Sequence, residues 1–217
     1  MQKNNTVIIV IAGVIIVVIG MMLYTSGRNK AGAPVAPLGA SPAAAVDSHG
    51  HPIGKQTPAT SLAGFINKPA ADFSLADRNG KMYSLRELRG KNVILFFNEG
   101  LMCYPACWNQ IVSLAKDARF KDSNTEVLSV VVDPPQDWRG AIDKMPELAE
   151  ATVVFDTDTS VSRQFGMLTN ASSMHYGSLP GHTYMIIDTE GIIRNVFDDP
   201  TMSIHNDHLF AEIARLN

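Results

Sequence analysis

Two residues of this 217-residue chain stand out for their chemistry: Cys103 and Cys107, which are its only cysteines and are separated by three residues. Two cysteines are too few, and lie too close together, for the disulfide framework that staples a small secreted domain. A close pair is typical of a redox-active dithiol or of two ligands to a metal ion. Alternatively, both cysteines could be buried thiols that have only a structural role. The pair therefore indicates redox or metal chemistry and does not choose between them.

The elements around the cysteines place them between a strand and a helix. Asn92 to Phe97 form a continuous apolar run of strand length, and the chain breaks at Asn98-Glu99-Gly100. From Trp108 onward, apolar side chains recur at helical spacing. These side chains are Ile111, Leu114, Ala115 and Ala118. We therefore expect both cysteines at a strand-to-helix junction.

The start of a helix suits a reactive cysteine. Unpaired backbone N–H groups and the positive end of the helix dipole stabilise a thiolate, which lowers the pKa of the thiol and makes it a nucleophile near neutral pH. Cys107 directly precedes the expected helix and should benefit most. A second cysteine within reach, Cys103, can resolve the product as a disulfide.

The rest of the domain predicts an α/β fold. Residues 69–90 begin with short alternating segments around a turn at Asn79-Gly80, which indicates a β-hairpin. Ser84 to Glu87 then has the pattern of a capping box that opens one helical turn. Further strands are expected at 126–132, 153–155, 183–187 and 192–197. Helices are expected at 138–150, with an interruption near Pro146, and at 160–165 and 207–216. This order predicts a sheet of mixed strand direction with helices on both faces.

The N-terminal region differs from the domain in composition. Val7 to Leu23 contains no charged or polar side chain and, with its flanks, has the length that spans a bilayer. We therefore predict a short tail at 1–5, an uncleaved transmembrane anchor at 6–25, a flexible Ala/Pro/Gly linker at 26–63 and a folded domain at 64–217.

The charges around the predicted anchor do not fix its orientation, because Lys3 on one side is balanced by Arg28 and Lys30 on the other. A redox domain on a short N-terminal anchor is a common extracytoplasmic design. By this analogy we expect a single-pass membrane protein whose domain lies outside the cytoplasm.

The charge of the predicted domain argues against nucleic acid as a partner. From Gly64 onward the chain holds 14 of its 18 Lys and Arg and 20 of its 21 Asp and Glu, so the domain carries a net charge of −6. A protein that binds phosphates needs a basic stripe, and this sequence offers none.

Several motifs resemble the thioredoxin-fold redoxins of the alkyl hydroperoxide reductase and thiol-specific antioxidant superfamily. They are PAADFSLADRNGKMYSLRELRGKNVILFF, the Cys103 to Cys107 turn and TYMIIDTEGIIRNVF, which occur in the expected order between Pro69 and Phe197. The resemblance implies a thioredoxin-like fold with an N-terminal β-hairpin extension. It also implies a thiol reductant or a disulfide-bearing protein as partner, peroxide as a possible substrate, and no cofactor.

The cysteine turn departs from the patterns of this superfamily. Peroxiredoxins place Thr or Ser three residues before the peroxide-reacting cysteine, whereas Tyr104 and Gly100 hold those positions here. Thiol-disulfide reductases have two residues between their cysteines, and this chain has three. Before the strand TYMII, reductases show a cis-proline and peroxiredoxins an arginine, whereas this chain has His182.

The CxxxC spacing with a distant histidine is similar to the SCO-type copper chaperones. By that resemblance Cys103, Cys107 and His182 would bind copper, and thiolates with one imidazole suit this metal. His182 could instead lower the pKa of a cysteine or relay its proton, or serve as a structural histidine. We expect the other histidines of the domain, His175, His205 and His208, to be solvated.

The leading hypothesis is a membrane-anchored thiol-disulfide oxidoreductase or peroxiredoxin-like antioxidant protein that cycles Cys103 and Cys107 between dithiol and disulfide. Cys107 is the expected attacking thiolate and Cys103 the resolving one, although in reductases of the CxxC type the first cysteine attacks. A copper chaperone that uses Cys103, Cys107 and His182 is the alternative. An interaction module of the same fold without catalytic activity is the third hypothesis.

Overall fold

The computed structural model describes residues 61–216. The predicted tail, the predicted anchor at 6–25 and all but the last three residues of the predicted linker lie outside the described residues. Within residues 61–216, no helix has the length and apolar character needed to cross a bilayer.

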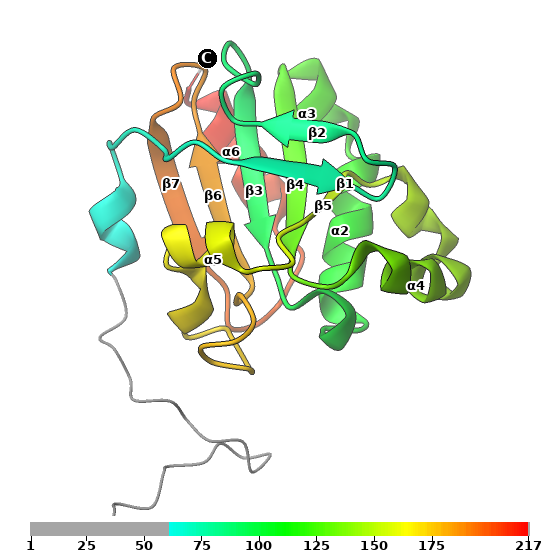
Figure 1. Ribbon diagram of the computed structural model, residues 1–217. Coiled ribbons are helices and arrows are strands. Elements are labelled where there is room, and N and C mark those ends of the chain that lie inside the picture. Colours follow the sequence, from blue (N-terminus) through cyan, green and yellow to red (C-terminus); the bar gives the residue numbers. More distant parts are fainter. Residues whose placement is uncertain (1–60, 217) are drawn as a thin grey trace, which may run out of the picture. The chain divides into compact units, whose positions relative to one another are not determined.

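One mixed sheet of seven strands forms the centre of the domain, in the order β2-β1-β5-β4-β3-β6-β7 (Figure 1). The strands β3, β4 and β5 are parallel, whereas β6 runs antiparallel to β3 and β7, and β1 runs antiparallel to β5 and β2. This arrangement confirms the expected α/β fold. The strands are β1 (Ser74–Asp77), β2 (Met82–Ser84), β3 (Asn92–Phe97), β4 (Thr125–Val131), β5 (Val153–Phe155), β6 (Thr183–Ile187) and β7 (Ile193–Asp198).

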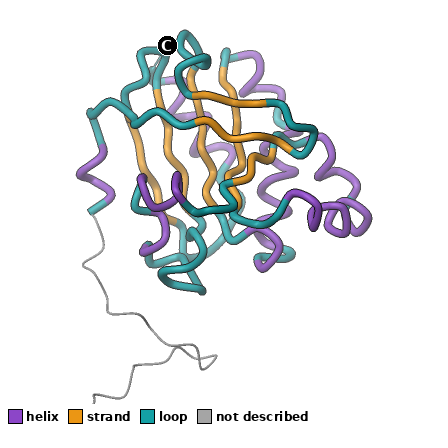
Figure 2. Tube along the Cα trace, viewed as in Figure 1, coloured by secondary structure: helices purple, strands orange, loops and turns teal. Residues whose placement is uncertain are grey.

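Helices cover both faces of the sheet (Figure 2). In Figure 1, α2 and α6 lie behind the sheet and α5 lies in front of it. The α-helices are α2 (Ala106–Lys116), α3 (Ala118–Asp122), α4 (Trp138–Lys144), α5 (Ser160–Gln164) and α6 (Asn206–Ala214). Short 3-10 helices span Leu62–Phe65, Gly100–Met102, Pro135–Asp137, Pro146–Glu150 and Met167–Thr169.

The position of β3 inside the sheet explains why its residues 93–97 are all apolar. Successive side chains of a strand point to opposite faces, and both faces of this sheet are covered. Ile94 and Phe96 therefore pack in one core with α2 and α6, and Leu95 and Phe97 pack in the other with α5. All six residues of β3 are buried. The cysteines and Trp108 belong to the first of these cores.

The N-terminal hairpin forms as expected and joins the main sheet. β1 and β2 pair around the Asn79-Gly80 turn, where Gly80 has a φ of 80° that favours glycine. The single helical turn expected from Ser84 is confirmed, because the Leu88 N–H donates to the Ser84 carbonyl at 3.2 Å within the turns at 85–90. Leu85 joins this turn to the hairpin, because it is buried and its N–H donates to the Phe73 carbonyl at 3.2 Å.

Candidate functional site

The cysteine turn lies where β3 leads into α2. After β3 the chain forms the 3-10 helix Gly100–Met102, reaches Cys103 and enters α2 at Ala106. Cys107 therefore lies inside the first turn of the helix, which begins two residues earlier than the sequence suggested. That position still places Cys107 at the positive end of the helix dipole.

Cys103 and Cys107 form a disulfide, with their Cα atoms 5.3 Å apart. The start of the helix is intact in this oxidised state, because the Cys107 N–H donates to the Cys103 carbonyl at 3.0 Å. Both side chains are buried. The turn therefore accommodates the disulfide without loss of helix α2.

His182 meets the cysteines from the neighbouring strand. It immediately precedes β6, which pairs with β3 so that Phe97 lies opposite Thr183. Its Nδ1 atom is 3.4 Å from Cys107 Sγ, and its side chain is fully buried. The structure thus brings together the three residues singled out in the sequence, with their ligating atoms within 4.8 Å of one another.

Burial keeps the imidazole of His182 neutral near pH 7. Desolvation lowers the pKa of His182 to about 4, and the nearby Asp199 carboxylate only partly opposes this effect. A neutral imidazole can accept a proton from a thiol beside it, provided that Nδ1 carries no hydrogen. His182 is therefore placed to act as a base for Cys107 in the reduced protein.

Tyr184 is a site residue that the sequence reasoning missed. Its hydroxyl lies 2.8 Å from His182 Nε2, and its ring stacks on Phe96 with centroids 4.6 Å apart. Burial raises the pKa of Tyr184, so the hydroxyl stays protonated and can donate or accept a hydrogen bond. The signal was present in the sequence, because residues two apart on a strand share one face of the sheet.

Asp133, which follows β4, fixes the chain ahead of Cys103. Its Oδ2 atom accepts hydrogen bonds from the Leu101 N–H at 3.1 Å and from Trp138 Nε1 at 3.3 Å. Burial raises the pKa of Asp133 above its usual range. Gly100 has a φ of 58°, and a Cβ atom at this position would collide with the Asp133 carboxylate. The turn therefore requires glycine at position 100.

Aromatic side chains cover the outer side of the cysteine turn. Trp108 donates from Nε1 to the Gly100 carbonyl at 3.0 Å, and Tyr104 packs edge-on against Trp108 with ring centroids 4.8 Å apart. The ammonium of Lys144 lies 3.5 Å from the centre of the Tyr104 ring. These contacts tie α4 to the turn and hold Tyr104 at the surface beside Cys103.

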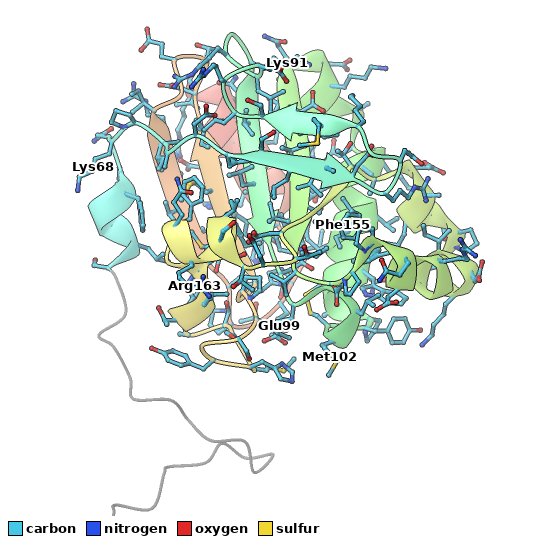
Figure 3. All side chains as sticks on the ribbon, in the orientation of Figure 1. Lys68, Lys91, Glu99, Met102, Phe155 and Arg163 are labelled. Atoms are coloured by element: carbon cyan, nitrogen blue, oxygen red, sulfur yellow. A yellow bond between two sulfur atoms is a disulfide. The ribbon has the colours of Figure 1, made fainter. Side chains whose placement is uncertain are left out.

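Two buried carboxylates, Glu99 and Asp199, each hold a loop in place near the cysteine turn. Glu99 accepts from the N–H groups of Met174 at 2.6 Å and His175 at 3.0 Å, and its Oε2 lies 3.1 Å from His175 Nδ1. Figure 3 shows Glu99 and Met102 at the same end of the sheet. His175 is half-buried, so the expectation that it is solvated is wrong.

The second carboxylate, Asp199, holds the turn that follows β7. It accepts from the N–H groups of Thr201 at 2.8 Å and Ser203 at 2.7 Å, and from His205 Nε2 at 2.8 Å. Met202 lies between Thr201 and Ser203 in this turn, and its Sδ atom is 3.8 Å from Cys103 Sγ. His205 is therefore half-buried rather than solvated, whereas His208 is exposed as expected.

Comparison with known proteins links the domain to one family. The profile of the AhpC/TSA family matches residues 66–196. The chain is 32% identical over 146 residues to Peroxiredoxin Bcp of Escherichia coli K12, an overlap that covers 64% of this chain and 88% of that protein. It is 25% identical over 142 residues to the chloroplastic Peroxiredoxin Q of Populus jackii, which covers 62% of this chain and 61% of that protein.

Solved structures share the fold. Peroxidoxin BcpB of Mycobacterium tuberculosis matches with a TM-score of 0.59 and 22% identity, over 70% of this chain and 97% of that one. AhpC of Enterococcus faecalis matches with a TM-score of 0.60 and 20% identity, over 70% and 91%. At these identities the likeness shows the thioredoxin-like fold alone.

Proposed function

We propose, because the chain belongs to the AhpC/TSA family of peroxiredoxin-like thiol oxidoreductases, that it reduces a peroxide by cycling Cys103 and Cys107 between dithiol and disulfide. The observation that supports this proposal best is the Cys103–Cys107 disulfide at the start of α2, with His182 beside Cys107. This arrangement supplies a nucleophile, a base and a resolving thiol within one turn.

The proposed cycle begins at Cys107. His182 takes the thiol proton, and the thiolate attacks one peroxide oxygen, which breaks the O–O bond. The other peroxide oxygen leaves with its substituent and takes the proton from His182, so that an alcohol or water is released. Cys107 becomes a sulfenic acid. The Cys103 thiol then attacks this sulfur, so that water leaves and the disulfide forms. Two external thiol groups reduce the disulfide and restore both protein thiols.

Two contacts support Cys107 as the peroxide-reacting residue. Cys107 lies in the first turn of α2, whereas Cys103 lies before the helix. His182 Nδ1 approaches Cys107, whereas Cys103 contacts the thioether of Met202. A thioether cannot take up a thiol proton at neutral pH. A protein disulfide is an alternative substrate of the same cysteine pair, since thiol-disulfide exchange would run through the same two sulfurs.

The proposed location is a membrane surface. Residues 6–25 would anchor the protein through a single helix, and the linker at 26–63 would carry the domain outside the cytoplasm. The apolar run in the sequence supports this proposal. Fractionation of cells that express the full chain tests it: recovery with washed membranes is expected, and recovery in the soluble fraction would contradict it.

Copper binding is a second candidate function because of one observation. The ligating atoms of Cys103, Cys107 and His182 lie within 4.8 Å of one another, and soft thiolates with an imidazole suit this metal. Copper would bind only to the reduced pair, since the disulfide removes both thiolates. The relatives named above are peroxiredoxins and lend this alternative no support.

One experiment separates the two candidates. The reduced full-length protein is mixed with hydrogen peroxide, and disulfide formation is followed by mass, while a parallel sample is titrated with Cu(I). Rapid disulfide formation that is lost in Cys107→Ser, with a sulfenic acid that accumulates in Cys103→Ser, is expected. We expect His182→Asn to slow the reaction by about 100-fold, the contribution of a general base. Slow oxidation with tight stoichiometric copper binding that His182→Ala abolishes would refute the peroxidase and favour the copper chaperone.

A further inference from the structure

We propose that Met202 covers the sulfur at which the electron donor attacks, and that this side chain therefore sets how large a thiol can reduce the disulfide. The inference rests on the proposed function, because it concerns the step that returns the oxidised protein to the dithiol. It adds a residue that determines the class of reductant.

The chain needs an external thiol for this step, since both of its cysteines are in the disulfide. A donor thiolate attacks one sulfur and forms a mixed disulfide, while the S–S bond of the protein breaks. The other sulfur leaves with the electron pair and then takes a proton. A second donor thiol releases the first, which yields two protein thiols and one oxidised donor. The surroundings of the two sulfurs decide which of them is attacked.

Cys107 is the better leaving group. Its sulfur lies at the start of α2, where the helix stabilises negative charge, and His182 Nδ1 is 3.4 Å away. Beyond the disulfide, the contact of Cys103 Sγ is with Met202 Sδ at 3.8 Å. A thioether neither donates a proton nor stabilises a thiolate. The donor is therefore directed to Cys103.

Cys103 is close to the surface but covered. The neighbouring Met102 and Tyr104 are 59% and 48% exposed, whereas Cys103 itself is 3% exposed. Met202 is partly buried against the same core as Cys103, and its Sδ atom contacts Cys103 Sγ at 3.8 Å. A donor thiol that attacks Cys103 must therefore displace the Met202 side chain from this sulfur.

The turn that carries Met202 is fixed at its base. The Asp199 carboxylate accepts from the N–H groups of Thr201 and Ser203, which flank Met202. The backbone is thus held, whereas the unbranched methionine side chain can change rotamer. A small thiol needs only a small displacement of this side chain, and a larger thiol needs its full removal. Met202 is therefore suited to discriminate between donors by size.

The test uses the oxidised full-length protein and two monothiols of different size, 2-mercaptoethanol and reduced glutathione. The rate of disulfide loss is measured for wild type, Met202→Ala and Met202→Leu, and acid-quenched mixed disulfides are located by mass. Met202→Ala is expected to accelerate glutathione about fivefold and 2-mercaptoethanol less than about twofold, with glutathione attached to Cys103. Met202→Leu keeps the cover and should leave both rates close to wild type.

Two further variants separate the loss of the Met202 side chain from other effects of the substitution. Met82, an exposed methionine on β2, provides the matched control Met82→Ala, which should change neither rate. Met202 has a φ of 51°, so Met202→Gly repeats the test without backbone strain. Equal acceleration of both thiols, no acceleration, or glutathione on Cys107 would overturn the inference. No peroxide is used, so a wild-type protein that fails to reduce peroxide would refute the proposed function without affecting this result.

Discussion

Glu99 and Asp199 are both buried carboxylates that hold loops near the disulfide. They differ in how far along the sequence their hydrogen-bond donors lie. Glu99, at the end of β3, accepts hydrogen bonds from residues 74 to 76 positions later. Asp199 accepts from residues two to six positions later in its own turn. Glu99 therefore joins two elements of the tertiary structure, whereas Asp199 shapes one local segment.

His182 lies where the two loops meet. The loop held by Glu99 leads into it, and its carbonyl accepts from the Asp199 N–H at 2.9 Å. Loss of Glu99 should disturb both the fold and the approach to His182. Loss of Asp199 should open one turn and leave the rest of the domain in place, since local segments can open independently of global unfolding.

The largest expected effect is that of Glu99→Gln. The substitution leaves an amide in place of a charged acceptor and weakens three or more buried hydrogen bonds, so we expect a loss of about 3 kcal/mol in the free energy of unfolding. Urea unfolding measures it. Glu126→Gln is the matched control, because its ion pair with the exposed Lys91 should contribute less than about 1 kcal/mol. Equal losses in the two variants would contradict the role assigned to Glu99.

The next effect depends on pH and arises at His182. The pKa of His182 in the folded protein, about 4, lies below its ordinary value of 6.5, so the unfolded chain binds more protons between these values. Stability is therefore greatest above pH 6.5 and falls as the pH drops towards 4, by about 2–3 kcal/mol from this residue. Urea unfolding between pH 4 and pH 8 measures it.

His182→Gln separates this contribution from those of the carboxylates. The variant should show a flatter dependence between pH 4 and pH 6.5, although it is less stable overall. An unchanged slope would mean that the imidazole between the two loops is in contact with water.

A smaller effect is expected from Asp199→Asn. The turn loses a charged acceptor, but its N–H groups can reach water once the turn opens, so we expect a loss of about 1–2 kcal/mol. Hydrogen exchange should increase over residues 199–205 and remain unchanged over 173–181. Faster exchange in both segments would remove the distinction between a local and a long-range role.

The smallest effects are those of the histidines that bind the two carboxylates. His175→Ala and His205→Ala each remove one of several hydrogen bonds at a half-buried position, and each should cost about 1 kcal/mol or less. Thermal unfolding compares them. Because Glu99 is expected to contribute more stability than Asp199, His175→Ala should cost at least as much as His205→Ala. A larger loss for His205→Ala would contradict this order.

The same contrast explains how much of the structure could be predicted from the sequence. Periodicity, which is local, located β3, the Asn79-Gly80 hairpin and the helix after the cysteines, and the order of elements gave the mixed sheet. The helical turn from Ser84 was also predictable, because the capping pattern that indicates it is local. The predicted membrane anchor stays a prediction, since it lies outside residues 61–216.

The site was predictable only in its cysteines and His182. Tyr184 could have been inferred from its spacing to His182. Glu99, Asp133 and Met202 could not, because each acts on a segment that only the folded chain brings near. A carboxylate or a methionine has no sequence signature for such a contact, since its partner is set by strand pairing.

Trp108 gives the cysteine pair a built-in optical signal. Its indole directly follows Cys107 in the chain and is fixed by the hydrogen bond to the Gly100 carbonyl. Trp108 belongs to the same buried core as both cysteines, and a disulfide near an excited indole quenches its emission by accepting an electron, whereas a dithiol quenches it less. The only other tryptophan, Trp138, lies with its ring 6.4 Å from that of Trp108. Each turn of the cycle should therefore dim and restore the protein's own fluorescence, so that both half-reactions can be timed in a stopped-flow instrument without a dye or a coupled enzyme.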